Sequence, residues 1–101
     1  IQVIILSISE KFEKYAEKVL NLLENHEIRA LVDNRNETIG KKIREAEMQK
    51  VPYMIIIGEN EEGKQKITVR QHGGEDLGMI SVETFSKIVE TEINKTLKTF
   101  K

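Results

Sequence analysis

Two short apolar runs, each about as long as one β-strand, constrain the fold of this chain most. They occupy residues 2–6 (Gln-Val-Ile-Ile-Leu) and 53–57 (Tyr-Met-Ile-Ile-Ile). Neither run alternates with polar residues, which is typical of strands buried on both faces. Between them lie a helical apolar pattern at 10–25, a β-branched stretch at 28–32 and a second helical pattern at 37–50. Strands that alternate with helices predict an α/β fold with a largely parallel sheet.

The second half of the chain predicts an antiparallel addition to this sheet. A polar loop at 58–63 precedes residues 66–70, which alternate as a half-exposed strand does. After a loop at 71–75, residues 77–80 predict a short edge strand. Ser81 then caps a final amphipathic helix. The predicted order is β-α-β-α-β-β-β-α.

Size and composition exclude several classes of protein. A chain of 101 residues makes one domain, and its start at Ile1 leads us to expect an excised C-terminal part of a longer protein, with residues 1–101 as that domain. There is no cysteine and there are two histidines, so we expect neither disulfides nor a metal site. No apolar run approaches the roughly 20 residues of a membrane span, which favours the cytoplasm. The net charge of −1 argues against strong nonspecific nucleic-acid binding.

The segment Gly58–Lys64 has the spacing of a P-loop and follows a predicted strand. Gln65 stands where a Mg²⁺-binding serine or threonine is needed, and three glutamates in the segment would repel phosphates. A strand is expected to follow, so no helix N-terminus would hold the phosphates. We therefore interpret the segment as a hairpin loop.

No catalytic group is predicted. The serines Ser7, Ser9 and Ser81 each precede a predicted helix, where they fit capping roles, Ser7 together with Glu10 as a capping box. No histidine is near any of them in sequence, so no nucleophile–base pair can be assigned.

A polar group is predicted near the carboxyl ends of the strands, where open α/β sheets bind ligands. Its members are Asn36, Glu61 and Arg70, with Arg35 and Arg44 nearby. Each of the first three also has an ordinary structural explanation. Asn36 can cap the second helix, Glu61 can be a solvated loop residue, and Arg70 can pair with Asp76. Taken singly, each structural explanation is favoured.

Three blocks of sequence together resemble a known family. Residues 33–45 read Asp-Asn-Arg-Asn-Glu-Thr-Ile-Gly-Lys-Lys-Ile-Arg-Glu, Val51–Met54 read Val-Pro-Tyr-Met, and Val69–Arg70 are followed by Asp76–Gly78. They resemble the C-terminal anticodon-binding domain of threonyl-tRNA synthetases, which are class IIa aminoacyl-tRNA synthetases, and the resemblance covers essentially the whole chain. It implies the class IIa anticodon-binding domain fold, a five-stranded mixed sheet with three helices.

The resemblance also implies a binding site for the anticodon loop of threonine tRNA. Asn36, Glu61 and Arg70 match the positions that read bases, and Arg44 belongs to a supporting basic set, with Arg35 beside it. Threonine anticodons carry guanine at the second position and uracil at the third. A carboxylate can accept from both N1–H and N2–H₂ of guanine, while arginine and asparagine can donate to carbonyl oxygens of either base.

For the longer protein, the resemblance implies a homodimeric ligase that attaches threonine to tRNA with ATP, Mg²⁺ and Zn²⁺. Those sites are expected in other domains, so this segment is expected to be a monomer when isolated, without cofactor, metal or membrane contact. One alternative keeps the fold and makes the chain a regulatory or accessory RNA-binding module without an aminoacylating parent. A small flavodoxin-like or P-loop enzyme is the other alternative, and it lacks the motifs.

Overall fold

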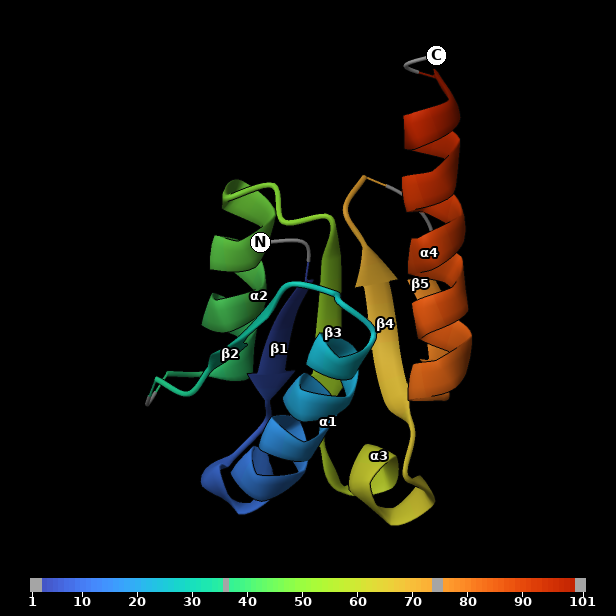
Figure 1. Cartoon of the computed structure of the whole chain (residues 1–101). Helices are drawn as coiled ribbons and strands as arrows, with labels where there is room; N and C mark the ends of the chain where they lie inside the picture. The colour runs from blue at the N-terminus through green and yellow to red at the C-terminus, as the bar shows by residue number, and fades with distance from the viewer. Residues whose placement is uncertain (1–2, 36, 74–75, 100–101) are drawn as a thin grey trace.

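The structure is a computed structural model that describes residues 3–35, 37–73 and 76–99, with side chains as far as Thr91. Its centre is a five-stranded sheet in the order β2-β1-β3-β4-β5 (Figure 1). The first three strands are parallel, and the last two are antiparallel to their neighbours. The strands are β1 (Val3–Ser7), β2 (Ala30–Asp33), β3 (Tyr53–Ile57), β4 (Ile67–Gln71) and β5 (Asp76–Ile80). The predicted mixed sheet is confirmed, including its short final strand.

Three long helices lie on the two faces of the sheet (Figure 1). On one face are α1 (Glu13–Asn25), preceded by the 3₁₀ turn η1 (Glu10–Phe12), and α4 (Val82–Thr99). On the other face is α2 (Ile39–Met48). In the part of the chain that the structure describes, no helix is both long and apolar enough to cross a membrane.

The larger core lies between the sheet and the pair α1 and α4. Phe85 of α4 is fully buried there, and its ring meets the edge of Tyr53 of β3 at a centroid distance of 5.2 Å. The smaller core lies under α2, where Ala46 and the half-buried Ile39 and Ile43 pack on β1 and on Met54. The two cores together explain why β1 and β3 read as continuous apolar runs.

The predicted loop at 58–63 is wrong, because a short helix, α3 (Glu59–Lys64), follows β3 directly. Glu59, Glu61 and Glu62 lie in its first turn, where the partial positive charge of a helix start favours acids. Gln65 ends the helix in the left-handed conformation, with φ of 55°. The acids that argued against a phosphate site are therefore also what makes this segment helical.

Two predicted helix starts also need correction. Ser7 lies in β1 and is buried, and the hydroxyl of Ser9 accepts from the backbone N–H of Lys11 at the start of η1. Helix α2 begins later than predicted, because the hydroxyl of Thr38 caps it by accepting from the N–H of Lys41. The predicted cap at Ser81 is confirmed, since its hydroxyl accepts from the N–H of Thr84.

Candidate functional site

One half of a sheet face is left uncovered by the described elements. Helix α2 packs on β1 and on Met54, so the same face of β4 and β5 beyond it stays open. Strand pairing places Thr68 beside Ile56 and Met79 in one row across this face, and Arg70 beside Asp76 in the next. We call the surface made by Ile56, Thr68, Arg70, Asp76 and Met79 the open face. Its residues alternate along β4 with Ile67 and Val69, which point into the larger core.

Glu61 lies where the sheet and α3 meet, and its carboxylate is held on both oxygens. Oε1 accepts from the backbone N–H of Gly58 at 2.8 Å, and Oε2 accepts from the hydroxyl of Thr68 at 2.7 Å. Only 9% of the residue is exposed. Glu61 is therefore not the solvated loop residue that its sequence context allowed. Its carboxylate also occupies the start of α3, the position that a phosphate would need.

Arg70 lies at the other end of the sheet from Glu61. It pairs across strands with Met54, near the start of β3, because β4 runs antiparallel to β3. The expected gathering of Arg70 with Glu61 at the carboxyl ends of the strands is therefore wrong. Its Nε lies 3.3 Å from Oδ1 of Asp76, which confirms the pairing that the sequence offered. Both residues line a depression of about 290 Å³ together with Glu47.

Glu61 nevertheless adjoins the open face that carries Arg70. Thr68, which holds the Glu61 carboxylate, and Arg70 are two residues apart on one strand, so their side chains point to the same side about 7 Å from each other. The structure thus places an acid, a hydroxyl and a guanidinium in line along β4. A single-stranded nucleic acid running along this line would meet both hydrogen-bond donors and hydrogen-bond acceptors.

Arg44 lies on the flank of α2 that is nearer to this surface. Ile43 and Ala46 point to the sheet, and Lys42 and Glu45 lie on the β2 side, where they contact Asp33 and Arg35. Helical spacing puts Arg44 on the opposite flank with Glu47, which lines the depression beside Arg70. Arg44 is exposed, and among the described residues no carboxylate lies within ion-pair distance of it. Its charge is available to a ligand.

Arg35, by contrast, is held inside a cluster on the β2 side. Its guanidinium contacts Asp33 at 2.9 and 2.8 Å and Glu45 at 2.6 Å. The hydrogen bonds from Arg35 hold the pKa of the Asp33 carboxyl below its ordinary value of 3.8, and both acids raise the pKa of Arg35. Two carboxylates therefore neutralise this cation within the protein, which leaves it less suited than Arg44 to a phosphate contact.

A buried lysine completes this cluster. Lys42 is only 4% exposed, and its ammonium donates to the backbone carbonyls of Ser7 and Asp33 at 3.4 and 3.3 Å. These carbonyls end β1 and β2, so the lysine joins the ends of two neighbouring strands, and the segment holding Asn36 follows β2. Asn36 itself lies outside the described residues. No role was predicted for Lys42 or Thr68 from the sequence, because the contacts that hold them come from residues distant along the chain.

The Asp33–Arg35 pair predicts a specific dependence of stability on pH. A carboxyl whose pKa is lowered on folding stabilises the native state above its unfolded pKa, and that contribution disappears as the pH falls through the folded pKa. We expect Arg35→Gln to melt a few degrees below the wild type at pH 7, and this gap to narrow once the pH falls below 3.8. Thermal unfolding from pH 7 to pH 2.5 measures it. A gap that stays constant over this range would show that the ion pair does not stabilise the fold.

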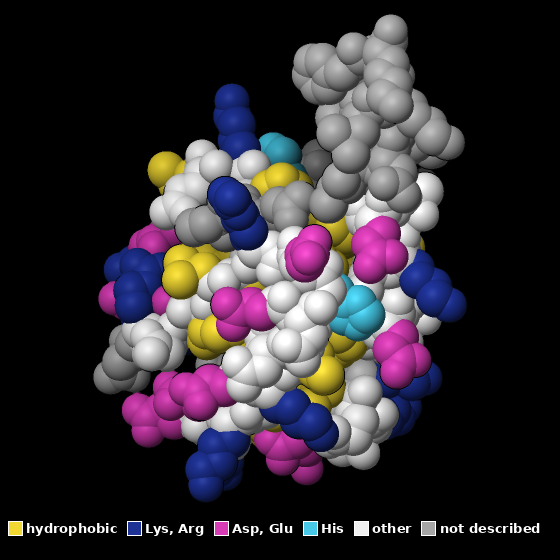
Figure 2. Space-filling model, viewed as in Figure 1, with side chains coloured by type: hydrophobic (Ala, Val, Ile, Leu, Met, Phe, Trp, Pro, Cys, Tyr) yellow, Lys and Arg dark blue, Asp and Glu magenta, His cyan; other side chains and the backbone are white. Residues whose placement is uncertain are grey.

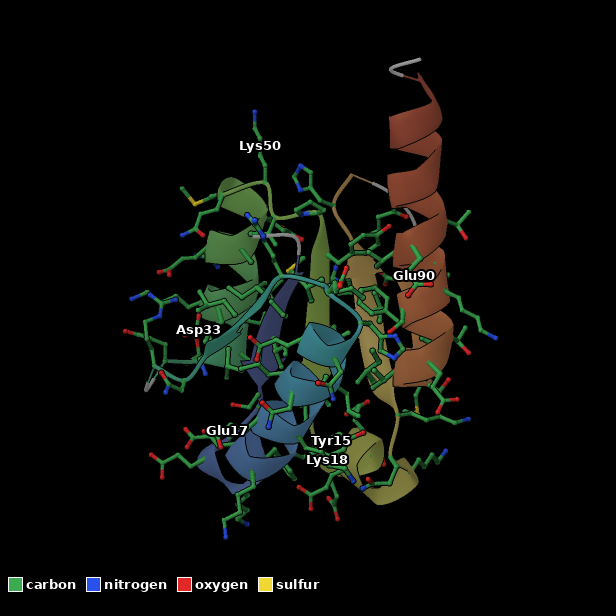
Figure 3. The ribbon with its side chains drawn as sticks, viewed as in Figure 1. Tyr15, Glu17, Lys18, Asp33, Lys50 and Glu90 are labelled. Carbon is green, nitrogen blue, oxygen red and sulfur yellow. The ribbon has the colours of Figure 1, made fainter. Side chains whose placement is uncertain are left out.

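The face that carries α1 and α4 has a different character. Basic and acidic side chains are interspersed over much of the surface that this view shows (Figure 2). Tyr15 and Lys18 lie at the end of α1 nearest α3 (Figure 3), where the tyrosine hydroxyl donates to the carbonyl of Lys66 and the lysine donates to Gln65. Burial, then the charges of Glu61 and Glu62, raise the pKa of Tyr15. These contacts fix α3 to α1.

Comparisons with known proteins show which family the chain resembles. A family model described as an anticodon binding domain matches residues 2–92. The chain is 66% identical over 101 residues to a threonine–tRNA ligase of Flavobacterium johnsoniae and 53% identical over 96 residues to that of Cytophaga hutchinsonii. These matches cover 98% and 95% of this chain. The chain spans only 16% and 15% of the length of these two relatives.

Solved structures give the same result for the fold. The RNA binding domain of a threonyl-tRNA synthetase from Cryptosporidium parvum superposes with a TM-score of 0.83 at 33% identity, over 89% of this chain and 23% of that one. A histidyl-tRNA synthetase from Nostoc superposes with a TM-score of 0.81 at 18% identity, over 91% of this chain and 22% of that one, which shows a shared fold alone.

Proposed function

This chain belongs to the anticodon-binding domain family, and we propose that it binds and reads the anticodon loop of threonine tRNA as one domain of a threonyl-tRNA synthetase. The observation that carries the proposal is the 66% identity to a threonine–tRNA ligase across nearly the whole chain. The open face adds physical support, because it carries the Arg70 guanidinium, adjoins the oriented Glu61 carboxylate and lies next to the exposed Arg44 on α2.

In the proposed complex, Glu61 reads the central guanine of the anticodon. Guanine presents N1–H and N2–H₂ side by side on its Watson–Crick edge, and a carboxylate accepts from both. Each carboxylate oxygen of Glu61 uses one acceptor site within the protein, and each retains another for a base. Arg70 donates to a base carbonyl, as Asn36 does from the segment after β2. Arg44 contacts a phosphate, and Arg35 shapes the segment that carries Asn36.

The chemistry of aminoacylation is assigned to the remainder of the longer protein. ATP and Mg²⁺ have no fitting site at α3, because the carboxylate of Glu61 fills the helix start and two further acids stand in the first turn. Zn²⁺ lacks its usual ligands here, since the chain has no cysteine and two histidines. We propose that the whole protein is a homodimer in the cytoplasm and that this domain contributes tRNA selection to it.

Binding of anticodon stem-loops tests the proposed function. The threonine stem-loop is expected to bind at least tenfold more tightly than the same stem-loop with adenine in place of the central guanine, which corresponds to about 1.4 kcal/mol. Equal affinity for both would contradict the proposal. Charging of threonine tRNA by the full-length protein is the second measurement. An accessory module would bind the stem-loop, whereas the longer protein that contains it would not attach threonine.

The salt dependence of this binding is expected to be shallow. The net charge is −1, and Arg70 of the open face lies beside Asp76, so few phosphates are neutralised. We expect the slope of log K against log salt to correspond to about three phosphate contacts, measured between 50 and 300 mM KCl by fluorescence anisotropy. A slope equivalent to eight or more contacts would reveal a basic surface elsewhere on the protein.

A further inference from the structure

Thr68 is the residue of the open face that touches Glu61. Its hydroxyl donates to Oε2 of the carboxylate at 2.7 Å, and the backbone N–H of Gly58 holds Oε1 at 2.8 Å. A carboxylate fixed at both oxygens cannot rotate about its terminal bond without breaking one of these contacts. The plane of the carboxylate, and with it the direction of its free acceptor sites, is therefore set by Thr68 together with the backbone of Gly58.

The start of α3 does not need this hydroxyl. The Gly58 contact already supplies the helix-capping bond, and that bond uses the other carboxylate oxygen. Thr68 also has its Cβ branch on a half-exposed strand surface, where valine would pack equally well. The hydroxyl therefore orients the side chain of Glu61, and neither strand β4 nor helix α3 needs it for stability.

We propose that Thr68 is a positioning residue for recognition of guanine, holding the Glu61 carboxylate in the plane that accepts from N1–H and N2–H₂ together. The inference rests on the proposed function of Glu61 as the guanine reader. It makes the preference for guanine depend on two side chains, Glu61 of α3 and Thr68 of β4, instead of on Glu61 alone. A carboxylate freed from Thr68 would still attract donors, but it would lose the fixed plane that favours two parallel hydrogen bonds over one.

The experiment compares guanine with inosine at the central anticodon position. Inosine keeps N1–H and lacks the amino group. The dissociation constant for the inosine loop divided by that for the guanine loop therefore reports the second hydrogen bond alone. Thr68→Val is expected to reduce this ratio by roughly 3- to 10-fold relative to the wild type. Thr68→Ser, which restores the hydroxyl, is expected to return the ratio to within about twofold of the wild type. A merely structural role of Thr68 would weaken binding of both loops equally and leave the ratio unchanged.

A matched control is Thr91→Val on α4, whose hydroxyl donates to the carbonyl of Lys87 far along the chain from the open face. It makes the same chemical change, and its ratio is expected to equal that of the wild type. Thermal unfolding of every variant confirms that each protein is folded at the assay temperature.

The outcomes separate this inference from the proposed function. A full ratio in Thr68→Val, with a ratio reduced by Glu61→Gln, would overturn the positioning role and keep Glu61 as the guanine reader. Failure of Thr68→Ser to restore the ratio would also overturn it, because the hydroxyl would then not be the acting group. A wild-type protein that does not distinguish guanine from inosine would overturn both the inference and the guanine assignment.

Discussion

Replacing Phe85 by alanine is expected to lower the free energy of unfolding by about 3–5 kcal/mol. The side chain is fully buried and joins α4 to the sheet through its edge contact with Tyr53. Its removal leaves a cavity at the centre of the larger core, which close packing around rigid strands cannot refill. Domains of this size are stable by about 5–15 kcal/mol, so the variant is expected to be partly unfolded at 37 °C. Urea denaturation followed by circular dichroism measures the loss.

Phe12→Ala is the matched control for this prediction. Phe12 lies in η1, is half-buried, and packs at the margin of the same core. The chemical change is identical, so the difference between the two variants isolates the effect of full burial. We expect a clearly smaller loss at Phe12, and equal losses at both positions would show that α4 is not a principal support of the sheet.

The patterns that predicted the fold correctly are those in which local spacing and burial agree. Strand β3 was predicted with its bounds as observed, because a continuous apolar run ended by glycine has few other solutions. Strand β4 followed from alternation, and the cap at Ser81 followed from a serine before an apolar stripe. These predictions are correct because the residues whose spacing predicts an element also form its buried face.

The patterns that failed depend on partners distant in sequence. The polar composition of residues 58–63 indicated a loop, yet a glutamate at the third helical position closes α3 on Gly58 and reaches across to Thr68. Arg70 was grouped with Glu61 although the predicted antiparallel direction of β4 already carries it toward the opposite end of the sheet. Lys42 looks like a solvated helix residue until two strand ends bring their carbonyls to it. The sequence therefore indicated which residue types belong to the candidate site, but not how these residues are arranged in space.

Replacing Glu61 by glutamine is expected to remove most of the preference for guanine at the central anticodon position, about 10- to 100-fold, or about 1.4–2.8 kcal/mol. The fold should tolerate the change. The amide oxygen can still accept from the N–H of Gly58, and the amide nitrogen can donate to the hydroxyl of Thr68, which is able to accept. Toward the base, however, the amide has a single acceptor oxygen. Its N–H₂ would face a donor of guanine, so one hydrogen bond becomes a repulsive contact.

Glu62→Gln is the control, because it removes the same charge one residue away without the contact to Thr68. It should leave the guanine preference unchanged, which separates the direction of the carboxylate from the net charge of α3. Arg70→Ala should weaken binding of every loop while the guanine preference persists, since its guanidinium lies about two residues further along β4. If both glutamate variants lower the preference equally, the effect is general electrostatics. A full preference in Glu61→Gln would instead make the carboxylate of Glu61 a helix cap alone and place recognition of guanine on another residue of the open face.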